Sequence, residues 1–160
     1  MQHCVERVSA LIRATLTLMN ATLLVIAIVA AALAALLHVY IFVMESVLWM
    51  RPSTWKRFGI RSQDDAGTIR PMALNQGFYN LFLAIGVIIG FFLLPHPSLN
   101  PAGVMLILFC CASMLAAALV LLISNPKLAR AALIQGVLPL IAVIALAILG
   151  VTILTGTATT

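Results

Sequence analysis

Charged side chains are scarce in this chain: only 8% of its 160 residues are Asp, Glu, Lys or Arg. Soluble domains carry about 25% charged residues and about 45–50% apolar ones. Here 64% of the residues are hydrophobic, and the mean hydropathy is +1.19. A water-soluble core of this length could not bury so much apolar surface. The composition therefore excludes a soluble domain and predicts an integral membrane protein.

Short catalytic and metal-binding motifs are also lacking. The sequence has no glycine-rich phosphate loop, no G-x-S-x-G nucleophile elbow and no H-E-x-x-H zinc pair. Cys110 and Cys111 are adjacent within an apolar run, and Cys4 stands alone near the start, so the spacing suits neither a zinc site nor a disulfide framework. We expect no metal and no cofactor, and we interpret Cys110 and Cys111 as packing residues.

Long apolar runs are what the chain does have. As a helix, about 20 apolar residues cross a hydrocarbon core of about 30 Å. Four stretches are long enough. They predict an all-α polytopic membrane protein with four transmembrane helices in an antiparallel bundle. The expected spans cover residues 21–50, 72–94, 102–123 and 131–155.

The nine Lys and Arg residues are unevenly distributed, which predicts the orientation of the chain. The 51–71 segment has five of them and the 124–130 segment has two, whereas the other side of the membrane has only Arg7 and Arg13. By the positive-inside rule, we expect the basic 51–71 loop to be cytoplasmic and both termini to be outside. Basic residues on so apolar a chain indicate contact with membrane lipids and not with nucleic acid.

The first 20 residues form an N-terminal tail or an interfacial helix in this interpretation, ahead of a transmembrane domain over residues 21–155. Met19 is an alternative start of the chain. We expect no cleaved signal peptide, because the first apolar run is too long and its far end carries His38 and Glu45 instead of a small-residue cleavage site.

The basic loop contains aromatic residues of its own. Trp49, Trp55 and Phe58 alternate with Arg and Lys, which favours an anchor at the level of the lipid head groups over a partner-binding surface. Ser62, with two aspartates after it, is expected to cap a short helix that ends before Pro71, where the second span begins.

Polar side chains interrupt the expected spans near their cytoplasmic ends. Glu45, Gln76 and Gln135 each lie four or five residues inside a span, about 6–8 Å below the membrane surface. A charged side chain at mid-membrane costs about 2.5–3.5 kcal/mol on insertion scales, so we expect these groups to meet in one pocket inside the bundle. The candidates for ligand binding or proton handling are His38, Glu45, Asn75, Gln76, Tyr79, Asn80 and Gln135.

Helical spacing predicts which of these side chains face one another. His38 and Glu45 are seven residues apart and share one face of the first span. Asn75, Gln76 and Tyr79 share a face of the second span. Antiparallel pairing of the two spans then places that face beside Glu45.

A direct contact between His38 and Glu45 is not expected, because seven residues of helix separate them by about 10.5 Å along the axis. The candidate bridging groups are Asn80, at a depth between the two, Tyr79 of the same span, and a water molecule. Gly86 and Gly90 form a small-xxx-small pattern on the same span, which predicts close approach of a neighbouring helix.

Three short motifs give the chain a family resemblance. They are HVYIFVME at the end of the first span, NQGFYN at the start of the second and IQG at the start of the fourth. Over residues 21–150 the chain resembles the bacterial membrane family known as domain of unknown function 1304. The resemblance implies a four-helix fold and a location in the bacterial inner membrane, and it implies no established activity.

Three functions are open at this point. A binding or transport module would hold a small polar molecule or a lipid head group in the pocket, and transport through so few helices would need a homo-oligomer. A membrane-embedded acid–base enzyme would act on a lipid with Glu45 as acid or base and His38 as its partner. A structural or assembly protein would use the polar groups only as interhelical hydrogen bonds, which contribute about 0.6 kcal/mol each on average in membranes.

Overall fold

Four long helices make up most of the chain. The computed structural model describes residues 2–157, apart from the side chains of residues 2–5, 8–9 and 153–157. The long helices are α1 (Gln2–Phe42), α3 (Gln63–Leu93), α4 (Asn100–Ser124) and α5 (Ala129–Thr157). Each is long and apolar enough to cross a membrane, and the described residues form no strand. The expected all-α class with four candidate spans is confirmed, and the protein is a multi-pass membrane protein.

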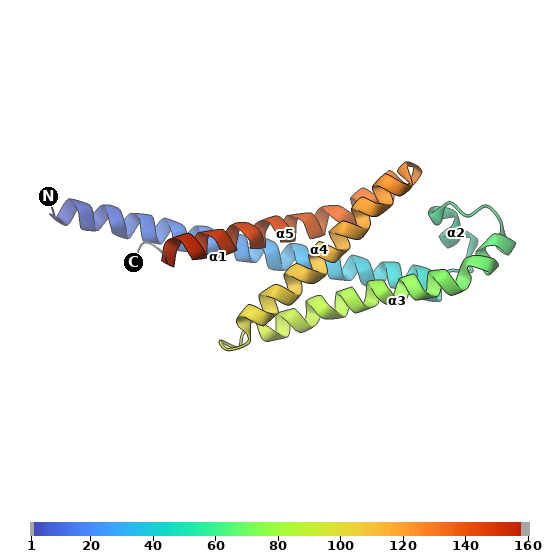
Figure 1. Ribbon diagram of the computed structural model, residues 1–160, viewed down its shortest axis with the longest axis horizontal. Coiled ribbons are helices and arrows are strands. Elements are labelled where there is room, and N and C mark those ends of the chain that lie inside the picture. The colour runs from blue at the N-terminus through green and yellow to red at the C-terminus, as the bar shows by residue number, and fades with distance from the viewer. Residues whose placement is uncertain (1, 158–160) are drawn as a thin grey trace.

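The helices run alternately up and down and pack as a ring (Figure 1). Helix α1 packs on α3 and α5, and α4 packs on the same two helices from the other side. Across the ring, α1 and α4 touch very little. Both termini lie at one end of the molecule, and the segment between α1 and α3 lies at the other (Figure 1).

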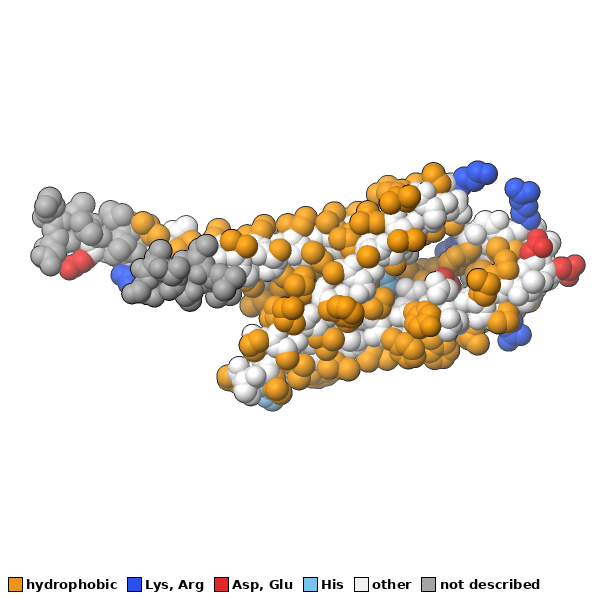
Figure 2. Space-filling view, in the orientation of Figure 1, with side chains coloured by type: hydrophobic (Ala, Val, Ile, Leu, Met, Phe, Trp, Pro, Cys, Tyr) orange, Lys and Arg blue, Asp and Glu red, His pale blue; other side chains and the backbone are white. Residues whose placement is uncertain are grey.

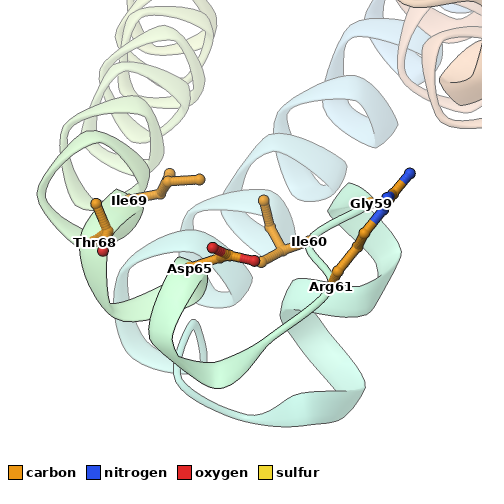
Figure 3. A pocket seen from close by; sticks show the side chains of 6 residues that line it. All are labelled: Gly59, Ile60, Arg61, Asp65, Thr68 and Ile69. Carbon is orange, nitrogen blue, oxygen red and sulfur yellow. The ribbon is translucent and has the colours of Figure 1, made fainter.

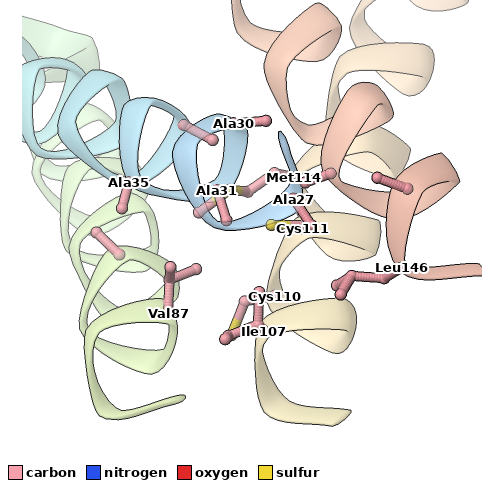
Figure 4. Close-up of a cluster of buried hydrophobic side chains, with 14 residues drawn as sticks. Ala27, Ala30, Ala31, Ala35, Val87, Ile107, Cys110, Cys111, Met114 and Leu146 are labelled. Carbon is pink, nitrogen blue, oxygen red and sulfur yellow. The ribbon is translucent and has the colours of Figure 1, made fainter. Parts of the chain in front are cut away.

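Small residues fill the middle of the bundle (Figure 4). Five buried alanines of α1 lie in this core, and α4 contributes Cys110, Cys111 and Met114 to it. Side chains as short as that of alanine bring helix backbones close together, which is how helices associate in a membrane. The packing role expected for the two cysteines is confirmed.

Glycines make the contact between α3 and α4 tighter still. A Cβ added to Gly86 would lie 2.5 Å from Sγ of Cys110, and one added to Gly90 would lie 3.0 Å from the backbone oxygen of Gly103. Neither position has room for a side chain. The close helix approach predicted from the Gly86–Gly90 spacing is therefore present, and the neighbour is α4.

The segment between α1 and α3 folds into short helical pieces. They are a π-helical turn η1 (Val43–Val47), α2 (Pro52–Trp55) and the 3-10 turn η2 (Lys56–Phe58). A second 3-10 turn, η3 (Pro126–Leu128), joins α4 to α5. Only one described residue adopts a left-handed backbone conformation: Gly59, with φ of 79°, ends η2.

Two tryptophans give this segment its own small core, which corrects the expected head-group anchor. Trp49 and Trp55 are each only 4% exposed and pack with Ala66 and Ala73. The indole nitrogen of Trp49 donates a hydrogen bond to the backbone oxygen of Ala66 at 2.8 Å. The large rings face inward because the turns after α1 fold back on the start of α3, which gives them a dry surface to cover.

The start of α3 also differs from the expectation. The side chain of Ser62 accepts a hydrogen bond from the backbone N–H of Asp65 at 3.0 Å, so it is a helix cap as predicted. However, the capped helix does not end before Pro71 but continues through it to Leu93. Pro71 has no N–H to donate to the carbonyl of Gly67 one turn earlier, and Gly67 is exposed, so solvent can satisfy that carbonyl.

Candidate functional site

A cavity of about 610 Å³ lies at the loop end of the bundle, where the ring of helices opens. Its lining comes from α1, η1, η2, α3, α4, η3 and α5, and most of it is apolar. A hollow is visible on this face between α4 and α3 (Figure 2). The polar side chains that line the cavity are Tyr40, Glu45, Arg57, Gln76, Asn80, Ser124 and Gln135.

A second depression, of about 310 Å³, lies between the residues that follow η2 and the start of α3 (Figure 3). Its lining includes Arg61, Asp65 and Thr68, which are all exposed, and it draws on no residue of α1, α4 or α5. It is an exposed surface at the start of α3, and side chains from the other three spans do not contribute to it. The larger cavity is therefore the candidate site.

Glu45 sits at the centre of the π-helical turn η1. The widened turn is closed by a hydrogen bond from the backbone N–H of Leu48 to the oxygen of Val43 at 2.9 Å. Such single π turns within helices occur frequently at functional sites. The side chain of Glu45 accepts a hydrogen bond from the amide nitrogen of Asn80 at 3.0 Å, and this same nitrogen donates to the backbone oxygen of Gln76 at 3.0 Å.

Helix α3 lies beside Glu45 at the expected depth, but the hydrogen bond of Glu45 comes from Asn80, one turn further along α3, and not from Asn75 or Tyr79. The glycine of the NQGFYN motif explains the close approach of α3 at this point. A Cβ at Gly77 would collide with Oγ of Ser46 and would lie 3.2 Å from Cβ of Glu45.

Asn75 and Tyr79 do not line the cavity, and both are exposed. Successive residues of a helix are about 100° apart, so each of these two points about 160° away from Gly77, which makes the contact with η1. Gln76 and Asn80, in contrast, both project on one side of Gly77, toward the cavity. Asn75 and Tyr79, which were expected in the pocket, thus lie outside the lining of this cavity, whereas their neighbours Gln76 and Asn80 belong to it.

His38 is buried within the bundle and does not line the cavity. Only 1% of it is exposed, and its Nδ1 lies 2.9 Å from the backbone oxygen of Ala34. The wider turn at 43–47 changes the angular relation between His38 and Glu45 that a regular helix would give. Asn80 contacts Glu45, and no hydrogen bond joins Asn80 to His38 among the contacts found for the described residues.

Gln135 lines the cavity from α5, and its neighbour Gly136 repeats the arrangement of Gln76 and Gly77. A Cβ at Gly136 would lie 2.9 Å from Cβ of Ala118 on α4. In both Gln–Gly pairs the glycine makes a helix–helix contact, and the glutamine beside it faces the cavity. Glu45, Gln76 and Gln135 line one cavity, as predicted from their depth.

Sequence reasoning missed a cation in this cavity. Arg57, from the turn η2, donates a hydrogen bond from Nη1 to the hydroxyl of Tyr40 at 3.0 Å, and both residues line the cavity. Tyr40 belongs to the HVYIF part of the first motif, and that motif is the only sequence feature that could have indicated its place in the site. Nothing in the sequence connects it with a loop arginine 17 residues later.

The chemistry of the site is that of hydrogen bonding and charge. Glu45 accepts hydrogen bonds, Arg57 donates them, and the two glutamines do both. Within residues 2–157, no group of three or more His, Cys, Asp or Glu side chains could hold a metal ion. No buried side-chain nitrogen or oxygen of the described residues lacks a hydrogen-bond partner.

Comparison with known families identifies the chain. Residues 32–147 match the family described as protein of unknown function (DUF1304), and the chain belongs to that family. The matched region contains all three motifs and every polar residue of the cavity. Neither the curated proteins nor the solved structures gave a significant match.

Proposed function

We propose that this protein binds a small polar molecule or a lipid head group in the cavity at the loop end of the bundle. The observation that supports this most is the convergence of Glu45, Gln76 and Gln135, from three different spans, on one cavity of about 610 Å³. Ligand sites are typically pockets of about 300–1,000 Å³ that are largely apolar and contain a few convergent polar groups.

The packing around these residues argues for a site and against a purely structural role. If Gln76 and Gln135 served only to join helices, they would bond to each other or to neighbouring backbone across a closed interface. Instead both line open space, and the adjacent glycines make the helix contacts. Polar groups within membrane spans are costly, so their placement around a cavity favours ligand contacts.

A membrane-embedded acid–base enzyme is the second candidate function. The π turn at Glu45 favours it, because such turns recur at active sites. The position of His38 outside the cavity lining weighs against it, since the expected acid–base pair does not face one space. Transport is a further extension of binding, and it would require the cavity to open toward the opposite end of the bundle.

We also propose an orientation, with the loop end in the cytoplasm and both termini outside. Its support is the concentration of five Lys and Arg in the 51–71 segment and two in the 124–130 segment, both at the same end of the bundle. In a background without the native cysteines, Ser62→Cys should resist an impermeant thiol reagent in intact cells and Thr157→Cys should react. The reverse labelling pattern would overturn this orientation.

Co-purification tests the binding proposal. Protein extracted in a mild detergent is analysed by mass spectrometry for small molecules, with Gln135→Leu compared with the wild type. Ser113→Ala is the matched control, because it removes a polar group on α4 that bonds only within its own helix, to the oxygen of Phe109 at 2.8 Å. We expect one molecule to be retained by the wild type and the control and to be depleted several-fold in Gln135→Leu. Equal retention in all three would contradict the proposal.

A further inference from the structure

The cavity has a polar part and an apolar part, and the two lie side by side. The polar part is formed by the groups around Glu45. The apolar part includes Leu37 and Ile41 of α1, Val120 and Leu121 of α4, and Ile134 of α5. A site built only for a small polar ion would not need a wall of this kind, since apolar surface contributes to binding only when the ligand covers it.

The apolar wall continues onto the lipid-facing surface of the bundle. Val120 is 65% exposed and Ile134 is 54% exposed, although both line the cavity. Tyr40 on the facing helix is 47% exposed. In a membrane these side chains contact lipid chains, so the cavity opens sideways toward the bilayer.

The cation at the rim is directed into this opening and not away from it. Arginine side chains near the end of a span usually extend toward the water and head-group region. Arg57, in contrast, points back to the hydroxyl of Tyr40, which belongs to the long apolar helix α1. That hydrogen bond uses one of the five N–H donors of the guanidinium, and the planar group suits a phosphate or a carboxylate.

One basic and one acidic side chain line the cavity. Among the described residues no ion pair joins Arg57 to an acidic side chain; Glu45, the acidic residue in the lining, has its hydrogen bond from Asn80. A ligand with a single charge would satisfy only one of the two. A head group with both an anionic group and hydroxyl or ammonium donors would satisfy Arg57 and Glu45 together.

We propose that the ligand of this cavity is an amphiphile that enters sideways from the lipid bilayer. Its anionic group pairs with Arg57, its hydroxyl or ammonium donors reach Glu45, Gln76 and Gln135, and its chain lies on the wall formed by Val120 and Ile134. The proposal rests on the proposed binding function and specifies the class of molecule bound.

Lipid titration tests this class of ligand. The delipidated protein in detergent is titrated with phosphatidylglycerol, with phosphatidylcholine of the same acyl chains and with inorganic phosphate, and bound molecules are counted by native mass spectrometry. We expect one phosphatidylglycerol to bind at least several-fold more tightly than phosphatidylcholine, whose head group has the phosphate but no donor. Inorganic phosphate alone should not compete, because it lacks the chain. Competition by phosphate would point to a free anion and overturn the lipid proposal.

Substitution of the arginine separates the cavity from general attraction of anionic lipids to a basic loop. Arg57→Gln should weaken phosphatidylglycerol binding by about tenfold, which corresponds to the loss of one charge-assisted contact. Arg61→Gln removes a loop arginine outside the cavity and should leave binding within about twofold. Equal losses in the two variants would reduce the effect to surface charge and refute the assigned site.

The failure of this inference can be told apart from the failure of the proposed function. If Gln135→Leu loses its co-purified molecule while Arg57→Gln keeps it, the cavity binds a ligand and the anionic head group is wrong. If both variants and the wild type retain the same molecules, neither the proposed function nor the lipid inference stands.

The apolar wall is tested by a larger side chain. Ala117→Phe, which narrows the apolar part of the cavity, should displace phosphatidylglycerol, and unchanged binding in this variant would also refute the lipid inference.

Discussion

The middle of the bundle and its loop end are built from the same four helices in different ways. In the middle, alanines and glycines bring the helices so close that a single Cβ would collide. At the loop end the helices separate, and the side chains between them are larger and partly polar. The difference teaches that in the two Gln–Gly pairs the glycine marks a helix contact, while the glutamine beside it marks the space that the contact leaves open.

Removal of the Trp49 side chain should have the largest effect, and it should be confined to the loop end. Trp49 packs in the small core of the loop, where its ring lies 5.3 Å from that of Phe58, a residue of the cavity lining. Truncation of a buried Trp costs about 3–5 kcal/mol. We expect Trp49→Ala to make the 51–71 segment sensitive to protease while the four spans stay assembled. Met50→Ala, at an exposed neighbour, is the control, and equal protease sensitivity in the two variants would contradict an independent loop core.

A side chain at Gly90, where α3 packs closely on the backbone of α4, should disturb the middle of the bundle next most strongly. A Cβ at Gly90 meets the backbone oxygen of Gly103 at 3.0 Å, and backbone cannot move aside as a flexible side chain can. We expect Gly90→Leu to cost about 1–3 kcal/mol or more and to lower the amount of folded protein in the membrane. Gly150→Ala is the matched control, since nothing lies within 4 Å of an added Cβ there. Similar thermal stability of the two variants would contradict the close contact between α3 and α4 at Gly90.

The Glu45–Asn80 contact should contribute much less to stability. Interhelical hydrogen bonds in membranes average about 0.6 kcal/mol and reach about 1.7 kcal/mol. A double-mutant cycle with Glu45→Gln and Asn80→Leu should give a coupling energy in that range in a reversible unfolding assay. Glu45→Gln should fold normally and yet lose ligand retention, because it keeps the shape and removes the negative charge. Full ligand retention by Glu45→Gln would show that Glu45 does not bind the ligand and only forms a structural hydrogen bond with Asn80.

Exposed polar residues on the far side of α3 should have the smallest effect. Asn75 and Tyr79 belong to the same motif as Gln76 and Asn80 but project away from the cavity. We expect Asn75→Ala and Tyr79→Phe to retain the co-purified ligand at the wild-type level. A loss as large as that of Gln135→Leu would show that the site extends to the outer face of the helix.

The spans and the convergence of polar residues could be predicted from the sequence for simple physical reasons. Hydrocarbon thickness fixes the length of a span, and residue counts from the span ends gave the common depth of Glu45, Gln76 and Gln135. Those predictions depend on distance along a helix, which barely changes with local irregularity. They therefore did not require knowledge of any side-chain contact.

Predictions that depended on angle around a helix were less secure. A π turn at 43–47 shifts the phase of everything after it, and no residue type in VMESV signals one. The depth of α3 beside Glu45 agrees with the prediction, but the face of α3 differs: Asn75 and Tyr79 were predicted to share the pocket face with Gln76, whereas Gln76 and Asn80 line the cavity. Arg57 could not be assigned at all, because its position depends on how the Trp49 core folds the loop back over α1.

An experimental structure in a lipid bilayer is the most direct test of whether the loop end is a binding site. The protein would be reconstituted in nanodiscs made from the membrane in which it is expressed and imaged with the cavity region resolved. We predict density for a bound molecule between α1, α3 and α5, within contact distance of Glu45, Gln76 and Gln135, with an extension past Val120. A closed loop end, in which protein side chains fill the cavity and the glutamines bond only to protein, would contradict the binding function.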